Sequence, residues 1–289
     1  MFLVQCVKIL FKSNERMKHL FTKQHKTFGQ SIFFVSCLFF INCQKEISSE
    51  TENKIDRLPS SILNLSNWKI TIPFDANGKD GSESGVAQEI KQTEFNTYTL
   101  PNYYFTNTTK DGVVFKAHAG GAHTSGSGFP RCELREMIEN GTKAAKWQSN
   151  VGKHTMEIDQ AITFLPSHKK HVVAGQIHST GDYDDVITCR LEDKKLFLSH
   201  NGVKGTMLTD NYVLGTRFKI KFVVENDEIK SYYNNSSKPN EVYSINFPDA
   251  YFKAGCYTQS ASWGKNDNHN ADRADYGEVV IYSLSVSHE

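Results

Sequence analysis

Three short stretches of the chain carry side chains that together could remove a proton from a carbon next to a carboxylate. Arg131 lies in the first stretch, Gln176 and His178 in the second, and Tyr257 in the third. A guanidinium and an amide can hydrogen-bond a carboxylate as negative charge develops on it. A histidine, which ordinarily titrates near neutrality, can act as the base, and a phenol can protonate the leaving oxygen. The set therefore predicts elimination chemistry on an acidic substrate.

The third stretch, residues 251–259, has the alternation of a β-strand. Small or apolar side chains occupy one face, and long polar side chains occupy the other. The polar face carries Tyr251, Lys253, Tyr257 and Gln259, and Gly255 leaves a gap there in which a ligand can approach the backbone. This face is suited to an extended, hydroxyl-rich, anionic ligand.

The other two stretches divide in the same way. Arg131, Glu133 and Arg135 share one face of a predicted strand. In the second stretch, Gln176 and His178 share a face. Taken singly, each row has an ordinary explanation as a solvated sheet face, so the functional interpretation depends on their combination.

The rest of the chain predicts an all-β fold. From about residue 100 onward, strand patterns alternate with turn signals such as Asn140-Gly141 and Asn201-Gly202, without interleaved helices. This pattern predicts a β-jelly-roll sandwich of two antiparallel sheets. The predicted strands cover residues 112–117, 131–138, 154–164, 171–178, 186–191, 196–199, 217–224, 229–233, 251–259 and 278–286.

Composition excludes some classes of function. The 289 residues carry a net charge of +1, which gives no electrostatic case for nucleic acid. The six cysteines show no zinc-site spacing, so we expect no metal and no cofactor. Cys132, Cys189 and Cys256 fall on the inward faces of predicted strands. We interpret them as small buried hydrophobes, although the sequence leaves a disulfide among them open.

The first part of the chain has the features of an export signal. The apolar run 31–42 follows a basic segment and precedes Cys43. We expect residues 1–43 to be a signal peptide of the lipoprotein type, with Cys43 lipidated, and a plain secretory signal or an uncleaved anchor is the alternative. Residues 44–58 are polar and without period, which predicts a tether, and residues 59–289 form the folded domain. The domain is then exported, as a secreted protein or a bacterial outer-membrane lipoprotein that meets the membrane only through its lipid.

The three stretches also resemble the signature blocks of a known family. Residues 131–135, 176–178 and 251–259 are similar to those of the polysaccharide lyase family 7 alginate lyases. The resemblance covers about residues 60–289. It implies a jelly roll whose concave sheet forms the substrate groove, alginate as the polysaccharide partner, and a monomer.

The resemblance also implies roles for single residues. Arg131 and Gln176 would neutralise the uronate carboxylate, and His178 would take the C5 proton of guluronate. Tyr257 would protonate the glycosidic oxygen, and on mannuronate it would be both base and acid. Ile177 favours guluronate-containing chains, and the product would carry an unsaturated uronate at its non-reducing end. The groove would be lined by Glu133, Arg135, Lys253 and Gln259.

Two alternatives compete with this interpretation. A glycoside hydrolase needs two carboxylates that flank the bond. Glu157 and Asp159 resemble part of a hydrolase strand motif, but Ile162 stands where its third acid belongs. A non-catalytic polysaccharide-binding module on the same sandwich is the second alternative. Whether the enzyme would cut within the chain or from its end is left open by the sequence.

Overall fold

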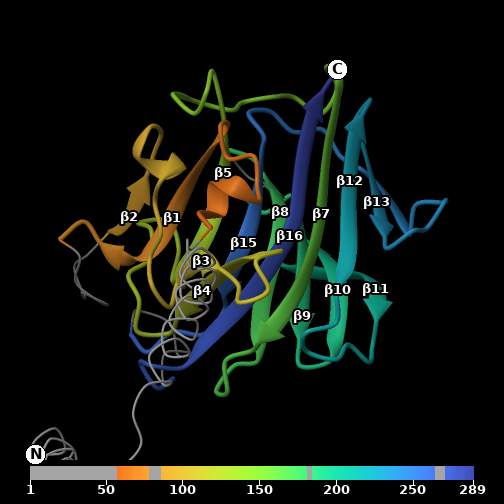
Figure 1. The fold of residues 1–289 in the computed structure, drawn as a ribbon. Helices are drawn as coiled ribbons and strands as arrows, with labels where there is room; N and C mark the ends of the chain where they lie inside the picture. Colours follow the sequence, from red (N-terminus) through yellow and green to blue (C-terminus); the bar gives the residue numbers. More distant parts are fainter. Residues whose placement is uncertain (1–56, 78–85, 181–183, 264–270) are drawn as a thin grey trace, which may run out of the picture. The chain divides into compact units, whose positions relative to one another are not determined.

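Two antiparallel β-sheets account for almost all the regular structure of the folded domain (Figure 1). The computed structural model describes residues 57–77, 86–180, 184–263 and 271–289. The only helices in these ranges are the short 3₁₀ turns η1 (Pro59–Ser61) and η2 (Glu94–Asn96). The predicted all-β sandwich is therefore confirmed.

The first sheet has nine strands and carries all three of the chemically interesting stretches. Its spatial order is β11 (Val203–Thr209), β10 (Lys195–His200), β9 (Ile187–Glu192), β8 (His171–His178), β15 (Tyr251–Thr258), β5 (Arg131–Ile138), β1 (Trp68–Asp75) and β2 (Ala87–Ile90), with β6 (Lys143–Ala144) paired to β5. Strands β8, β15 and β5 are consecutive in space although they are far apart in the chain, because the connections cross between the sheets.

The second sheet has seven strands and lies in front of the first in Figure 1. Its spatial order is β14 (Glu241–Ser244), β13 (Glu228–Tyr233), β12 (Phe218–Glu225), β7 (Lys153–Phe164), β16 (Tyr276–His288), β4 (Val113–His118) and β3 (Tyr104–Thr106). Apolar and polar side chains alternate along its strands, so the apolar face of the sheet packs against the first sheet. In β12, for example, Phe218, Ile220 and Phe222 are buried, while Lys219 and Lys221 between them are only half-buried.

The hydrophobic core lies between the two sheets. The first sheet contributes residues such as Leu134, Ile177 and Phe252, all fully buried, to the same cluster as Phe222 of the second. Each large apolar side chain buried in this way contributes about 1.5–3 kcal/mol. Since these inward residues alternate with the polar ones, the core fixes which side chains of β5, β8 and β15 face away from it.

Most of the strands that the sequence did not predict lie at sheet edges; β1, which lies between β5 and β2, is an inner strand that was also missed. β2, β3, β11 and β14 all end a sheet, and β6 pairs only with β5. Every residue of β11 and β14 is exposed or half-buried. An edge strand has a partner on one side only and is often short or polar, so it lacks the alternating apolar signal that reveals an inner strand.

The cysteine prediction holds within the described ranges. Cys132, Cys189 and Cys256 are buried and free. Burial raises the pKa of the Cys189 thiol to about 12, which makes it an unreactive core residue. The predicted signal peptide and Cys43, and most of the tether 44–58, lie outside the described residues and stay predictions. No helix in the described ranges is long and apolar enough to cross a membrane.

Candidate active site

The three sequence stretches meet at the centre of the nine-stranded sheet. β15 lies between β5 and β8, and its register places Tyr257 opposite Arg131 and Lys253 opposite Arg135. On its other side, Lys253 stands opposite Gln176. All of these side chains lie on the face of the sheet that points away from the core. The convergence predicted from the sequence is confirmed.

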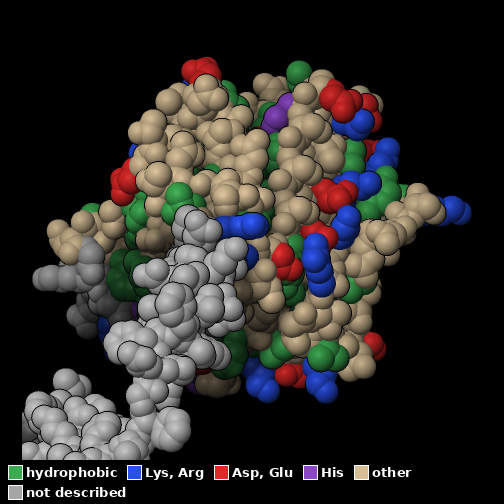
Figure 2. Space-filling view, viewed as in Figure 1, with side chains coloured by type: hydrophobic (Ala, Val, Ile, Leu, Met, Phe, Trp, Pro, Cys, Tyr) green, Lys and Arg blue, Asp and Glu red, His purple; other side chains and the backbone are tan. Residues whose placement is uncertain are grey.

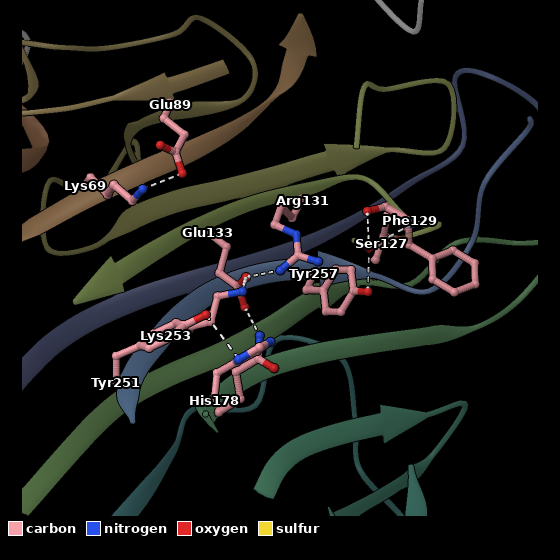
Figure 3. Close-up of polar contacts among 12 residues, drawn as sticks. Lys69, Glu89, Ser127, Phe129, Arg131, Glu133, His178, Tyr251, Lys253 and Tyr257 are labelled. Carbon is pink, nitrogen blue, oxygen red and sulfur yellow. Dashed lines mark hydrogen bonds and ion pairs between the residues drawn. The ribbon is translucent and has the colours of Figure 1, made fainter. Parts of the chain in front are cut away.

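A buried carboxylate joins several of these groups. Glu133 Oε2 accepts hydrogen bonds from Lys253 Nζ at 2.6 Å and Arg131 Nη1 at 3.0 Å, and its Oε1 accepts one from Gln176 Nε2 at 2.6 Å (Figure 3). The Glu133 side chain is 0% exposed. Burial opposes its ionisation, but the charges of Lys253 and Arg131 outweigh burial and hold its pKa below the usual value. Glu133 was expected to line a groove; in the structure it lies beneath the groups that it holds.

An irregularity in β8 brings Gln176 to this carboxylate. Ala174 belongs to the core cluster, so strict alternation would turn Gln176 inward as well. The register of β8 shifts between Val173 and Gln176 against β9, and the register of β15 shifts against β8 in the same region. Gly175 between them has φ +132°, a conformation that side chains disfavour. The shift returns Gln176 and His178 to the outer face.

His178 is a buried imidazole that is neutral at physiological pH. Its Nδ1 lies 2.8 Å from the carbonyl oxygen of Ser179, which can only accept, so Nδ1 carries the proton and Nε2 keeps a lone pair. The ring of Tyr251 stacks on the imidazole with a centroid distance of 5.1 Å, and its hydroxyl lies 3.1 Å from Nδ1. Burial, and then the charge of Lys253, lower the pKa of His178 to about 4. The expectation of a near-neutral pKa was therefore wrong, because it took no account of burial.

Tyr257 is held by a cation and by a hydroxyl. The Arg131 guanidinium lies over its ring, with Cζ 3.9 Å from the centroid. Its hydroxyl is 2.8 Å from Ser127 Oγ, which comes from the loop before β5 (Figure 3). Sequence reasoning missed Ser127, since a serine in a Gly/Ser-rich loop has no pattern that distinguishes it from its neighbours.

Residues 63–288 match the family model described as alginate lyase. This range is nearly the whole described domain and contains all three strands of the site. The chain belongs to this alginate lyase family.

Similar proteins agree with the family match. The solved structure of alginate lyase AlgAT5 from polysaccharide lyase family 7 is 45% identical with a TM-score of 0.73, covering 81% of this chain and 99% of that one. The alginate lyase from Corynebacterium sp. is 36% identical with a TM-score of 0.71 over the same shares. A curated alginate lyase of Klebsiella pneumoniae is 23% identical, covering 80% of this chain and 91% of its own length.

The protein is accordingly a polysaccharide lyase with alginate as its substrate, on the jelly-roll fold expected from the sequence. The two acids behind the hydrolase alternative lie elsewhere in this alginate lyase. Glu157 and Asp159 belong to β7 of the seven-stranded sheet, not to the sheet that carries the site. Figure 2 shows acidic and basic side chains side by side over β12 and β13. The buried Asp159 is bound by the exposed Arg217 at 2.6 Å, and Glu157 pairs with Lys219 at 3.6 Å.

The remaining predicted residues of the alginate lyase lie around the central set. Arg135 places its Cζ 4.0 Å from the centroid of the Tyr251 ring. Burial, and then the charge of Arg131, lower the pKa of Lys253 to about 8. Gln259 follows the end of β15, and its side-chain amide donates to the carbonyl oxygen of Thr258 at 3.4 Å. Lys69, on β1, adds a further cation opposite Arg135.

Proposed function

We propose that this alginate lyase cleaves the 1,4-glycosidic bonds of alginate by β-elimination, with a preference for guluronate-containing chains. The product is an oligosaccharide with an unsaturated uronate at its new non-reducing end. The observation that carries the proposal is the Glu133-centred arrangement, in which one carboxylate holds Arg131 and Gln176 beside the neutral base His178 and the phenol of Tyr257.

The carboxylate of the substrate has to be neutralised before its C5 proton becomes acidic. Arg131 supports this role, because a guanidinium has five N–H donors and the bond from Nη1 to Glu133 uses one of them. Gln176 uses Nε2 to donate to Glu133. A guanidinium with donors to spare is suited to a carboxylate whose charge increases as the proton departs.

Proton removal and proton donation then need a base and an acid. His178 supports the role of base, since its pKa of about 4 keeps it neutral at physiological pH and Nε2 has the lone pair. Tyr257 supports the role of acid, since the residue is half-buried and its hydroxyl lies 2.8 Å from Ser127 Oγ. After the product leaves, His178 releases to water the proton it took from C5 and Tyr257 regains a proton from water, so the enzyme is regenerated.

The guluronate preference follows from these two separate groups. Guluronate and mannuronate are C5 epimers, so their C5 protons point to opposite faces of the sugar ring. In guluronate, proton and leaving oxygen depart from opposite faces, which favours two groups; in mannuronate one group can serve both. Ile177 is fully buried in the core, so it acts on this choice only through the placement of its neighbours Gln176 and His178.

The test is the ultraviolet absorbance of the purified domain, without residues 1–43, mixed separately with polyguluronate, polymannuronate and a neutral β-glucan. We expect a rise from the conjugated double bond that is faster on polyguluronate than on polymannuronate. New reducing ends without this absorbance would mean hydrolysis and would overturn the mechanism. A faster rise on polymannuronate would overturn the preference alone.

A further inference from the structure

The loop before β5 is attached to the domain at its start and to Tyr257 at its tip. Ala119 N donates to Asp275 O at 2.6 Å, and Ala122 N donates to Pro73 O at 3.0 Å. The tip turns sharply, with Ser127 N donating to Thr124 O at 3.0 Å. The turn directs the Ser127 side chain toward β15, although the two residues are 130 positions apart in the sequence.

Ser127 Oγ is the middle of a chain of three oxygens. It lies 2.8 Å from the Tyr257 hydroxyl and 3.2 Å from the carbonyl oxygen of Phe129, and it accepts from Phe129 N at 3.2 Å (Figure 3). A serine hydroxyl has one proton to donate. While Tyr257 is protonated, it donates to Ser127, and Ser127 donates to the carbonyl of Phe129. The alternative direction, from Ser127 to Tyr257, becomes favourable once Tyr257 has lost its proton.

We propose that Ser127 is a positioning residue for Tyr257. When Tyr257 transfers its proton, the Ser127 hydroxyl turns from the carbonyl of Phe129 to the Tyr257 phenolate. This inference rests on the proposed role of Tyr257. It adds a residue from outside the three family blocks to the groups that control the proton-transfer step.

The proton balance of this step is simple. The C5 proton passes to Nε2 of His178, the C4–O bond breaks, and the Tyr257 proton passes to the departing oxygen, leaving a phenolate. The Ser127 proton stays on Ser127 and changes only its acceptor. Afterwards the imidazolium of His178 releases a proton to water and the phenolate regains one, so no proton is gained or lost overall.

The surroundings of Tyr257 leave the Ser127 hydroxyl as the group that can stabilise the phenolate by a hydrogen bond. From β5, the charged Arg131 contacts the ring face. From β8, the cross-strand neighbour is the apolar Val173, which offers the phenolate no donor. From the loop, Ser127 is the group whose hydrogen bond reaches the phenolic oxygen. Hydrogen bonds to charged groups stabilise more than those to neutral ones, so Ser127 favours the ionised state.

The experiment compares Ser127→Ala with Ser127→Thr, which retains a hydroxyl, and with Ser125→Ala, an exposed serine of the same loop. We expect Ser127→Ala to lower kcat on the preferred uronate polymer by about tenfold with KM changed less than about twofold. Ser127→Thr should recover most of kcat, and Ser125→Ala should match the wild type.

Rescue by the conservative variant separates this role from a merely structural one. A loss of kcat in Ser127→Ala that Ser127→Thr does not recover would overturn the proposal, and so would wild-type kcat in Ser127→Ala. Wild-type turnover by Tyr257→Phe would instead overturn the proposed function on which it rests.

Discussion

Gly255 stands directly opposite Glu133 in the register of β15 and β5. A Cβ atom at Gly255 would lie 2.9 Å from Glu133 Cα and 2.7 Å from the carbonyl oxygen of Cys132. Its backbone has φ +134°, a conformation that residues with a side chain rarely adopt. The missing side chain therefore allows the two strands to approach each other where the Glu133 carboxylate binds its partners.

Replacing Gly255 should destabilise the domain, because an added side chain would push β15 away from β5 at Glu133. We expect Gly255→Ala to lower the free energy of unfolding by roughly 2–5 kcal/mol, from backbone strain and overpacking combined. Urea denaturation measures the change. Gly126→Ala is the matched control, because nothing lies within 4 Å of a Cβ at Gly126. Equal stability of the two variants would show that the close approach is not required.

Removing the charge of Glu133 should leave Lys253 and Arg131 without their common partner. We expect Glu133→Gln to lower the free energy of unfolding by about 3–5 kcal/mol at pH 7. The folded-state pKa of Glu133 is below its usual value, so this stabilisation is present above the usual carboxyl range and is lost as the pH falls through the folded value. The difference between variant and wild type should therefore shrink below about pH 4.

Urea denaturation at neutral and acidic pH measures this difference. Glu228→Gln is the control, because Glu228 pairs with Lys230 at 3.4 Å on the exposed surface of β13 and should change stability little. A Glu133→Gln deficit that is the same at every pH would argue against an ionised carboxylate in the folded protein.

His178 should affect the two uronates unequally. We expect His178→Ala to reduce turnover on polyguluronate by at least about a hundredfold, and to reduce it less on polymannuronate, where Tyr257 can serve as the base. Initial rates of ultraviolet absorbance on the two polymers give the ratio. An equal loss on both would show that the base has been assigned to the wrong residue.

The lowered pKa of His178 also has a consequence for pH. Its folded-state pKa of about 4 lies below the usual histidine value, so the unfolded chain takes up the proton first as the pH falls. The stability that this residue contributes is complete above about pH 6.5 and is lost between about pH 6.5 and 4. An NMR titration of the His178 ring should have its midpoint near 4, and a midpoint near 6.5 would contradict the buried placement.

Tyr257→Phe should separate chemistry from folding. The substitution keeps the ring beneath Arg131 and removes only the hydroxyl that contacts Ser127. We expect turnover to fall by roughly a hundredfold or more, with the thermal unfolding midpoint within a few degrees of the wild type. Wild-type rates would refute the assignment of Tyr257 as the acid.

Glu136 should matter for stability through a different set of contacts. It points into the core, where it accepts from Trp147 Nε1 at 3.1 Å, Phe252 N at 2.9 Å and His288 Nε2 at 2.6 Å. Glu136→Ala leaves buried donors unpaired, so we expect a loss of roughly 2–5 kcal/mol in urea denaturation. Glu139→Ala, which removes an exposed ion pair at 3.2 Å, should cost less than about 1 kcal/mol. Similar losses in the two variants would contradict this account.

Most inner strands and their faces could be predicted from the sequence, because burial of one face imposes a period of two on the strand. β1 was missed: it is buried along nearly its whole length and lacks that alternation. The stretch 131–138 was predicted with the bounds of β5, and 171–178 with those of β8. Edge strands such as β11 could not be predicted in this way, since nothing covers their outer residues.

The amino-acid sequence by itself determined which residue types share a face of a strand. Those residues in turn indicated the family and the type of reaction. Only the tertiary structure decided how these groups act on one another. It brought Glu133 under Arg131 and Gln176, buried His178 enough to lower its pKa to about 4, and carried Ser127 to Tyr257. These effects depend on distance and burial between residues far apart in the chain, and a local pattern of side chains contains neither quantity.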